Sequence, residues 1–233
     1  MAHFHPQKVL SERCNPMERI AVIDYGMGNL RSVEKALAEV ACSAVVRVTD
    51  DPDEIANADR VVFPGQGAMP DCIAELERRN LTHVVKNVSR DKPFLGICIG
   101  LQLLFESSEE GDTRGLSILQ GEVKKFRPDR LGAFGEKFKV PHMGWNSVNF
   151  LGEHPVFEGL NSGERFYFVH SYHVQPTEKQ IVLGTTEYCA EFPSVVVDEN
   201  IVAVQFHPEK SQAAGLKLLS NFVSWKGARS RYL

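Results

Sequence analysis

Hydrophobic positions in the first half of the chain follow two different spacings. Short apolar runs with the composition of strands lie at 20–24, 44–48, 60–64 and 94–98. Apolar residues at helical spacing lie between and after them, at 30–41, 68–79, 81–89 and 99–106. Short strands that alternate with helices predict βαβ crossovers, which place the strands parallel in one sheet and cover both of its faces.

The pattern changes after residue 115, where strand-like runs follow one another without helices between them. These runs lie at 122–126, 165–174, 181–188 and 194–207. Within the last run, Asp198-Glu199-Asn200 separates two apolar stretches in the manner of a hairpin turn. A final helical pattern covers 211–226. Because no repeat and no low-complexity linker divides the two halves, we expect them to share a single three-layer α/β domain.

The two ends of the chain differ from this domain. Residues 1–19 contain two prolines and show no sustained period, which is typical of a flexible arm. Residues 229–233 form a short basic tail. We therefore expect the folded domain to span 20–228.

Composition excludes several classes of protein. Hydrophobic residues make up 43% and charged residues 24% of the chain, which is typical of a globular protein and not of a disordered, collagen-like or coiled-coil chain. With 26 basic against 30 acidic residues, the net charge is −4. The chain therefore lacks the overall basic field that would favour a nucleic-acid partner.

Cysteine usage and apolar stretches indicate where the protein works. The 5 cysteines are scattered and form no CxxC pair, which argues against a disulfide framework or a metal site and favours a reducing cytosol. The start of the chain lacks the apolar core of a signal peptide. The longest apolar stretch, 94–105, is too short to span a bilayer. We expect a cytoplasmic protein with no membrane segment.

The strongest chemical signal is Gly96-Ile97-Cys98-Ile99-Gly100, at a predicted junction between a strand and a helix. A sharp turn there would expose Cys98 as a nucleophile, with small neighbours to make room for it. The start of the following helix stabilises a thiolate, and the N–H of Ile99 can face a developing oxyanion. The alternative is a buried structural cysteine between two packing glycines.

Two further segments supply what a nucleophilic cysteine needs. His207 and Glu209 close a predicted strand, and residues two apart in an extended chain point the same way. They could form a base with its orienting carboxylate, or only a surface pair at a strand end. The loop Pro64-Gly65-Gln66-Gly67 follows another strand and could turn its N–H groups toward the same sheet edge, or be a plain turn.

Together, the loop, the cysteine and the His-x-Glu pair are similar in kind and order to class I, triad-type glutamine amidotransferases. The resemblance covers about 20–226 and implies a mixed, mostly parallel central sheet flanked by helices, with a smaller second sheet. Other segments resemble the glutaminase subunits of imidazole glycerol phosphate synthases, which act in histidine biosynthesis. They are DYGMGNL (24–30), PGQGAMPDC (64–72), HMGWN (142–146), FVHSYH (168–173) and QFHPEKS (205–211).

The resemblance implies a catalytic triad in which Cys98 attacks the glutamine carboxamide and forms a γ-glutamyl thioester. His207 would move the protons, and Glu209 would orient His207. The oxyanion hole would use the N–H of Ile99 and one from the loop Gly65, Gln66, Gly67.

The resemblance also implies how glutamine binds. Gln102 matches a position that contacts the substrate, and backbone groups around Ser171 and Tyr172 would hold its α-amino and carboxylate ends. No metal ion and no organic cofactor is implied.

A partner is implied as well, because the family passes its ammonia to a (β/α)₈-barrel cyclase in a heterodimer. That cyclase makes imidazole glycerol phosphate and an aminoimidazole carboxamide ribotide. The residues that match the partner-facing set are Pro141, Met143, Trp145 and Lys210. Family members are poor glutaminases alone. A loop that aims a carbonyl instead of an N–H into the oxyanion hole, until the interface shifts it, would account for this.

Other interpretations remain open from the sequence. The chain could supply ammonia to a different synthase, such as an enzyme that aminates a cell-surface sugar. It could be a catalytically silent regulatory subunit, or an unrelated Cys-His-Glu hydrolase. DYGMGN (24–29) lacks the third glycine of GxGxxG, which predicts a tight turn near the subunit interface and not a phosphate loop. His170 and His173 would face opposite sides of one strand, which argues against a shared metal.

Overall fold

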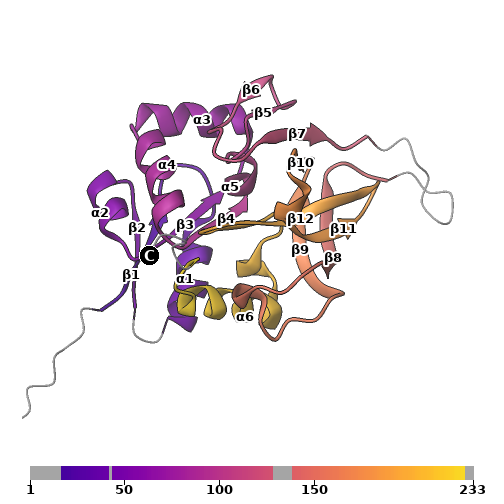
Figure 1. Ribbon diagram of the computed structural model, residues 1–233. Helices are drawn as coiled ribbons and strands as arrows, with labels where there is room; N and C mark the ends of the chain where they lie inside the picture. The colour runs from indigo at the N-terminus through magenta and orange to yellow at the C-terminus, as the bar shows by residue number, and fades with distance from the viewer. Residues whose placement is uncertain (1–16, 42–43, 128–137, 229–233) are drawn as a thin grey trace, which may run out of the picture.

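The computed structural model of this chain describes residues 17–41, 44–127 and 138–228. These residues form a large mixed sheet with helices on both faces and a smaller second sheet (Figure 1). The predicted three-layer α/β fold is confirmed, including its mixed central sheet and its second sheet. None of the described helices is long and apolar enough to cross a membrane.

The parallel half of the large sheet consists of five adjacent strands. From the edge inward they are β2 (Val45–Thr49), β1 (Arg19–Ile23), β3 (Arg60–Gly65), β4 (Phe94–Cys98) and β13 (Ile201–Val204). Each strand is parallel to its neighbour. Every residue of β3 and β4 is buried, because helices cover both faces of the sheet here. The carboxyl ends of these two strands carry the glycine-rich loop and Cys98.

The antiparallel half continues the same sheet beyond β13. Its strands are β12 (Glu191–Asp198), β11 (Val182–Glu187), β8 (His142–Phe150) and β9 (Glu164–His170). β12 and β13 pair antiparallel from Asp198 and Ile201 onward, so the hairpin turn predicted at 198–200 is confirmed.

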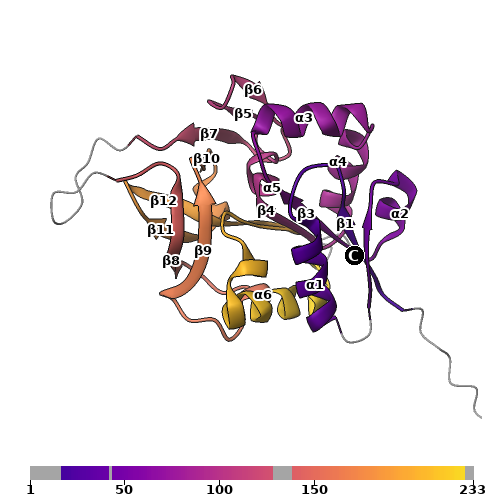
Figure 2. The ribbon, with the colours of Figure 1, turned by 180° about the vertical axis from the view of Figure 1, so that it is seen from behind.

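Helices cover the two faces unequally (Figures 1 and 2). α1 (Leu30–Val40) and α6 (Gln212–Ser224) pack against each other on one face. The other face carries α3 (Met69–Arg78), α4 (Thr82–Asp91) and the short α2 (Pro52–Asn57). In α1 the buried positions are Val33, Ala36 and Leu37, the spacing of one helical face.

The second sheet corrects one prediction. Its strands are β10 (Tyr172–Pro176), β7 (Gly121–Lys125), β5 (Ser107–Ser108) and β6 (Thr113–Arg114). The single strand expected over 165–174 is wrong, because the chain leaves the large sheet after His170 and enters the small one at Tyr172. The carbonyl oxygen of Ser171 accepts a hydrogen bond from the Phe126 N–H at 3.0 Å. Ser171 is therefore the corner where the two sheets meet.

The helix expected over 99–106 is also shorter than predicted. α5 (Ile99–Gln102) ends after four residues, although the next three side chains are fully buried. The carbonyl of Leu103 accepts from the N–H of Leu116, and that of Leu104 accepts from Ile118, each at 2.8 Å. Because a returning segment takes these carbonyls, they cannot continue the helix.

The chain ends are only partly described. Arg19, counted in the predicted arm, is the first residue of β1. Glu18 forms an ion pair of 2.9 Å with the buried Arg60, so this end of the predicted arm is anchored. The rest of that arm, 1–16, and the predicted basic tail, 229–233, lie outside the described residues.

Candidate active site

Cys98 is the last residue of β4 and has the backbone conformation of a strained turn. Its φ of 56° and ψ of −108° are unusual for a residue with a side chain. A Cβ atom on Gly100 would lie 1.8 Å from the carbonyl oxygen of Phe63, and one on Gly96 would lie 3.1 Å from the Cβ of Ala203. The two glycines therefore let β3, β4, β13 and α5 approach closely enough to present the thiol at the sheet edge.

His207 and Glu209 form a buried pair just after β13. The Nδ1 atom of His207 donates to Oε1 of Glu209 at 2.8 Å, and their side chains are 7% and 2% exposed. Burial disfavours the imidazolium, but the Cys98 thiolate and Glu209 outweigh it and raise the pKa of His207 to about 10. Since Nδ1 faces the carboxylate, Nε2 is the nitrogen that is available to the thiolate.

One cavity of about 400 Å³ brings most of the predicted residues together. The predicted residues that line it are Gly65, Gln66, Gly67, Cys98, Ile99, Gln102, Pro141, Ser171, Tyr172, His207 and Lys210. Glu209 is not in the lining and lies behind His207. The elbow and the loop after β3, predicted from separate segments, therefore surround one space together with the corner at Ser171.

Met143 and Trp145 are outside the cavity lining. Both lie on β8, where the two residues are 61% and 39% exposed. The Trp145 ring meets that of Tyr167 edge-on at 6.2 Å, and the Lys210 ammonium lies 5.9 Å from the Tyr167 ring centroid. Because Tyr167 lines the cavity, this exposed surface is continuous with the wall of the candidate site.

Buried side chains pack closely against the glycine-rich loop. A Cβ on Gly65 would lie 2.3 Å from the hydroxyl oxygen of Tyr25, so only glycine fits there. Gly67 has a φ of +107°, which favours glycine. The carbonyl of Gln66 lies 3.7 Å from the thiol sulfur of Cys72, which is in a position to donate to it.

Gln102 is held by two acceptors. Its Nε2 atom donates to the Tyr172 carbonyl and to Oε1 of Gln205, both at 3.1 Å. Its Oε1 atom is buried and has no hydrogen-bond partner among the described residues. A buried acceptor without a partner is costly, so this oxygen is available to a donor on a bound molecule.

The cavity is also lined by residues that were not predicted for the site, Glu110, Tyr167, Val169 and His170, and Gln205 lies beside Cys98. Glu110 lines the cavity and supplies its only carboxylate among the described residues. Its Oε2 atom accepts from the Met69 N–H at 2.8 Å. Gln205 belongs to the QFHPE segment, but no pattern in that segment assigns it a role. Glu110 had no signal beyond its place in an acidic stretch, since only the fold brings it to the cavity.

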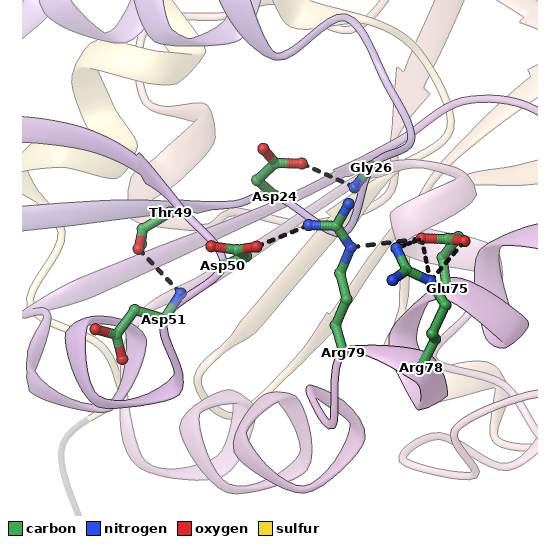
Figure 3. Close-up of polar contacts among 8 residues, drawn as sticks. All are labelled: Asp24, Gly26, Thr49, Asp50, Asp51, Glu75, Arg78 and Arg79. Atoms are coloured by element: carbon green, nitrogen blue, oxygen red, sulfur yellow. Dashed lines mark hydrogen bonds and ion pairs between the residues drawn. The ribbon is translucent and has the colours of Figure 1, made fainter.

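The segment DYGMGN forms a turn that side chains hold in place (Figure 3). The Gly26 N–H donates to Asp24 at 2.8 Å, and a Cβ on Gly26 would lie 2.8 Å from the Arg79 guanidinium. Arg79 in turn pairs with Asp50 at 2.8 Å and with Glu75 at 3.4 Å. The predicted tight turn is present, and Arg79, which directly follows α3, packs against it.

Comparisons with known proteins agree with this geometry. The family model "Glutamine amidotransferase class-I" matches residues 21–225. Imidazole glycerol phosphate synthase subunit HisH from Thiobacillus denitrificans is 58% identical over 207 residues, 88% of this chain and 91% of that relative. The subunit of the same name from Aromatoleum aromaticum is 57% identical over 211 residues, 90% of this chain and 99% of that relative.

A solved structure shows the same fold at low sequence identity. PurLQS from Thermotoga maritima matches with a TM-score of 0.66 and 18% identity, covering 89% of this chain and 98% of that one. The resemblance inferred from the sequence segments is confirmed. The chain belongs to the class-I glutamine amidotransferases and, within them, to the family of the HisH subunits of imidazole glycerol phosphate synthase.

Proposed function

We propose that this chain hydrolyses glutamine to glutamate and ammonia, as the glutaminase subunit of an imidazole glycerol phosphate synthase in histidine biosynthesis. The observation that carries the proposal is the strained elbow of Cys98, which faces a buried His207–Glu209 pair across one cavity. Family membership favours this function over ammonia supply to a different synthase.

The first half of the reaction makes the thioester. The Cys98 thiolate attacks the carboxamide carbon, and the carbonyl π electrons move onto oxygen. When the tetrahedral intermediate collapses, the C–N bond breaks and His207 donates its proton to the departing ammonia. His207 is neutral at the end of this step, and the γ-glutamyl group is bound to sulfur.

The second half of the reaction releases glutamate. Neutral His207 takes a proton from water as the water oxygen attacks the thioester carbon. The C–S bond then breaks, and the sulfur leaves as a thiolate beside the new imidazolium. Glu209 stays ionised throughout and stabilises the charge on His207, which agrees with the raised pKa of that histidine.

The negative charge on the carboxamide oxygen needs donors. We assign this role to the N–H of Ile99 and to one N–H from the loop Gly65–Gly67, which lie in the same cavity lining as Cys98. Losing one such donor costs about 10²- to 10³-fold in rate. A loop conformation that removes the second donor would therefore keep the isolated subunit slow.

The amino-acid end of the substrate meets a different part of the cavity. The carbonyl oxygens of Ser171 and Tyr172 already accept hydrogen bonds within the chain. Glu110 supplies a carboxylate to the cavity lining. We propose that it binds the α-ammonium group of glutamine. Other backbone groups around Ser171 and Tyr172, together with Gln102, would complete the binding of the substrate.

We propose a cytoplasmic heterodimer in which a (β/α)₈-barrel cyclase covers the mouth of the cavity. Met143 and Trp145 expose apolar area on β8, and the adjoining residues Pro141 and Lys210 line the cavity itself. An aromatic anchor beside a small polar rim is typical of such an interface. Ammonia could then pass to the cyclase without entering bulk solvent.

A glutamate-release assay tests both the chemistry and the partner. Wild type and Cys98→Ala are compared with and without the cyclase and its nucleotide ligand. We expect strong stimulation of the wild type by the loaded cyclase and no glutamate from Cys98→Ala. Turnover that needs Cys98 but ignores the cyclase would point to a different synthase.

A further inference from the structure

The amide of Gln205 lies between the candidate substrate-binding residue Gln102 and the nucleophile Cys98. Gln205 follows β13, is fully buried and donates its backbone N–H to the Ser194 carbonyl at 2.9 Å. Its Oε1 atom accepts from Gln102 at 3.1 Å, and its Nε2 atom lies 3.8 Å from the sulfur of Cys98.

Hydrogen-bonding chemistry fixes which end of each amide faces which neighbour. The Tyr172 carbonyl can only accept, so the Gln102 atom that faces it must be Nε2. The same Nε2 faces Gln205, which must therefore offer its oxygen. The Gln205 amide nitrogen then faces the sulfur of Cys98, and this orientation does not depend on an arbitrary amide flip.

The same argument fixes the free end of Gln102. Because both N–H bonds of Gln102 are used within the chain, its Oε1 atom remains as a buried acceptor without a partner among the described residues. Gln102 lines the cavity, so a donor on the substrate can satisfy this oxygen. Without the oxygen of Gln205, one of the two bonds that hold this orientation is lost.

We infer that Gln205 is a catalytic residue that acts in two directions: its N–H group supports the Cys98 sulfur anion, and its carbonyl oxygen holds Gln102 ready to accept from the substrate. The inference rests on the proposed glutaminase function and adds a residue to it. Cys98 is 4% exposed, so the sulfur has little solvent contact in this state to offset a lost donor. α5 spans only one turn, so its dipole contributes little to the sulfur anion.

Two variants separate the two ends of the Gln205 amide. Gln205→Glu keeps an oxygen for Gln102 but replaces the donor near sulfur with a carboxylate. Gln205→Met keeps the size of the side chain and removes both hydrogen bonds. Thr186→Val is the matched control, because it removes a buried hydrogen bond to Ser194 (2.8 Å) at a residue outside the cavity lining.

The first measurement needs no glutamine and no partner. Alkylation of Cys98 by iodoacetamide is followed at its own peptide by mass spectrometry across pH, since only the thiolate displaces iodide at a useful rate. We expect the Gln205→Glu profile to move to higher pH by about one to three units, because a nearby like charge disfavours the thiolate. Gln205→Met should move in the same direction by less, and Thr186→Val should match the wild type.

The second measurement is glutamine hydrolysis in the complete complex with the cyclase. We expect Gln205→Glu to lower kcat with little change in KM, and Gln205→Met to raise KM as well because Gln102 loses its anchor. A folded Gln205→Met whose alkylation profile and KM both equal those of the wild type would overturn the inference, even if Gln205→Glu fails to fold. If no protein hydrolyses glutamine but the alkylation shift persists, the proposed function fails and the support of the sulfur by Gln205 stands.

Discussion

His142 donates a hydrogen bond from Nδ1 to Nε2 of His170 over 3.0 Å, and the direction of this bond is fixed by its surroundings. His170 uses its other nitrogen to donate to the Tyr172 carbonyl at 2.7 Å, so Nε2 of neutral His170 must accept. On the far side, Asn146 donates to Nε2 of His142 at 3.2 Å. A directed chain of polar groups therefore runs from β8 to the carbonyl that positions Gln102.

This histidine pair makes stability depend on pH. Burial lowers the pKa of His142 to about 4 and that of His170 to about 3, whereas an unfolded histidine titrates near 6.5. Between about pH 6.5 and 4 the unfolded chain binds more protons, so acidification favours unfolding. We expect the free energy of unfolding, measured in urea, to fall steadily as the pH is lowered from about 6.5 to 4.

The variant His142→Phe tests the assignment of this pH dependence. It removes one histidine of this pair and leaves Nε2 of His170 without its donor, which costs about 1–3 kcal/mol at neutral pH. The slope of stability against pH should become smaller. An unchanged slope would show that other groups cause the acid sensitivity.

Glu209→Gln tests the charge behind His207. A glutamine can still accept from Nδ1 but no longer stabilises the imidazolium, and the amide can also turn its N–H toward the ring. By analogy with other triads, we expect kcat to fall by about 10²- to 10⁴-fold, while glutamine binding to the inactive variant changes little. The readout is glutamate release at saturating glutamine, with calorimetric binding as the control. A loss of less than tenfold would remove Glu209 from the mechanism.

Gly67→Ala tests the loop after β3. Its φ of +107° strains any side chain, and the new Cβ would lie 2.8 Å from the terminal carbon of Met27. The added methyl biases the conformation of the loop, so we expect activation by the partner to change more than KM for glutamine. Basal and activated rates are measured in parallel. Equal effects on both would contradict a role of this loop in activation.

Trp145→Ala tests the partner surface. Trp145 is 39% exposed and lies outside the cavity lining, where its ring meets Tyr167 edge-on, so truncating it should leave the basal glutaminase rate intact. As an aromatic anchor it should cost about 2 kcal/mol or more in cyclase binding, as measured by titration calorimetry. Leu151→Ala is the control, since Leu151 is an exposed apolar residue (63%) that directly follows β8. Equal losses from both variants would argue against Trp145 as the anchor.

The sequence was sufficient to predict the parallel half of the fold and to single out the three residues of the candidate triad. Strands such as 60–64 and 94–98 are mostly apolar because they are buried on both faces. Such a run can be recognised in the sequence without knowing which strands lie beside it. Cys98, His207 and Glu209 were found because each belongs to a local segment with its own chemical logic. Their meeting in one cavity follows from the shared carboxyl edge of the sheet.

The remaining features depend on distant neighbours. β8 was missed because Gly144 and Asn146 interrupt its apolar alternation, and Asn146 is held by groups as far away as the Glu187 carbonyl. The break at Ser171 was missed because both β9 and β10 are strands, and only their different partners separate them. Glu110 and Gln205 carry no local signal, since their neighbours in the site are distant in sequence.

The most direct test of the central claim is to trap the γ-glutamyl thioester. The complex with the loaded cyclase is given glutamine and hydroxylamine, which attacks the thioester carbon and releases γ-glutamyl hydroxamate and the free thiol. We predict hydroxamate from the wild type, none from Cys98→Ala, and hydroxamate formation that competes with glutamate release. Hydroxamate or glutamate formed by Cys98→Ala at the wild-type rate would contradict covalent catalysis by Cys98.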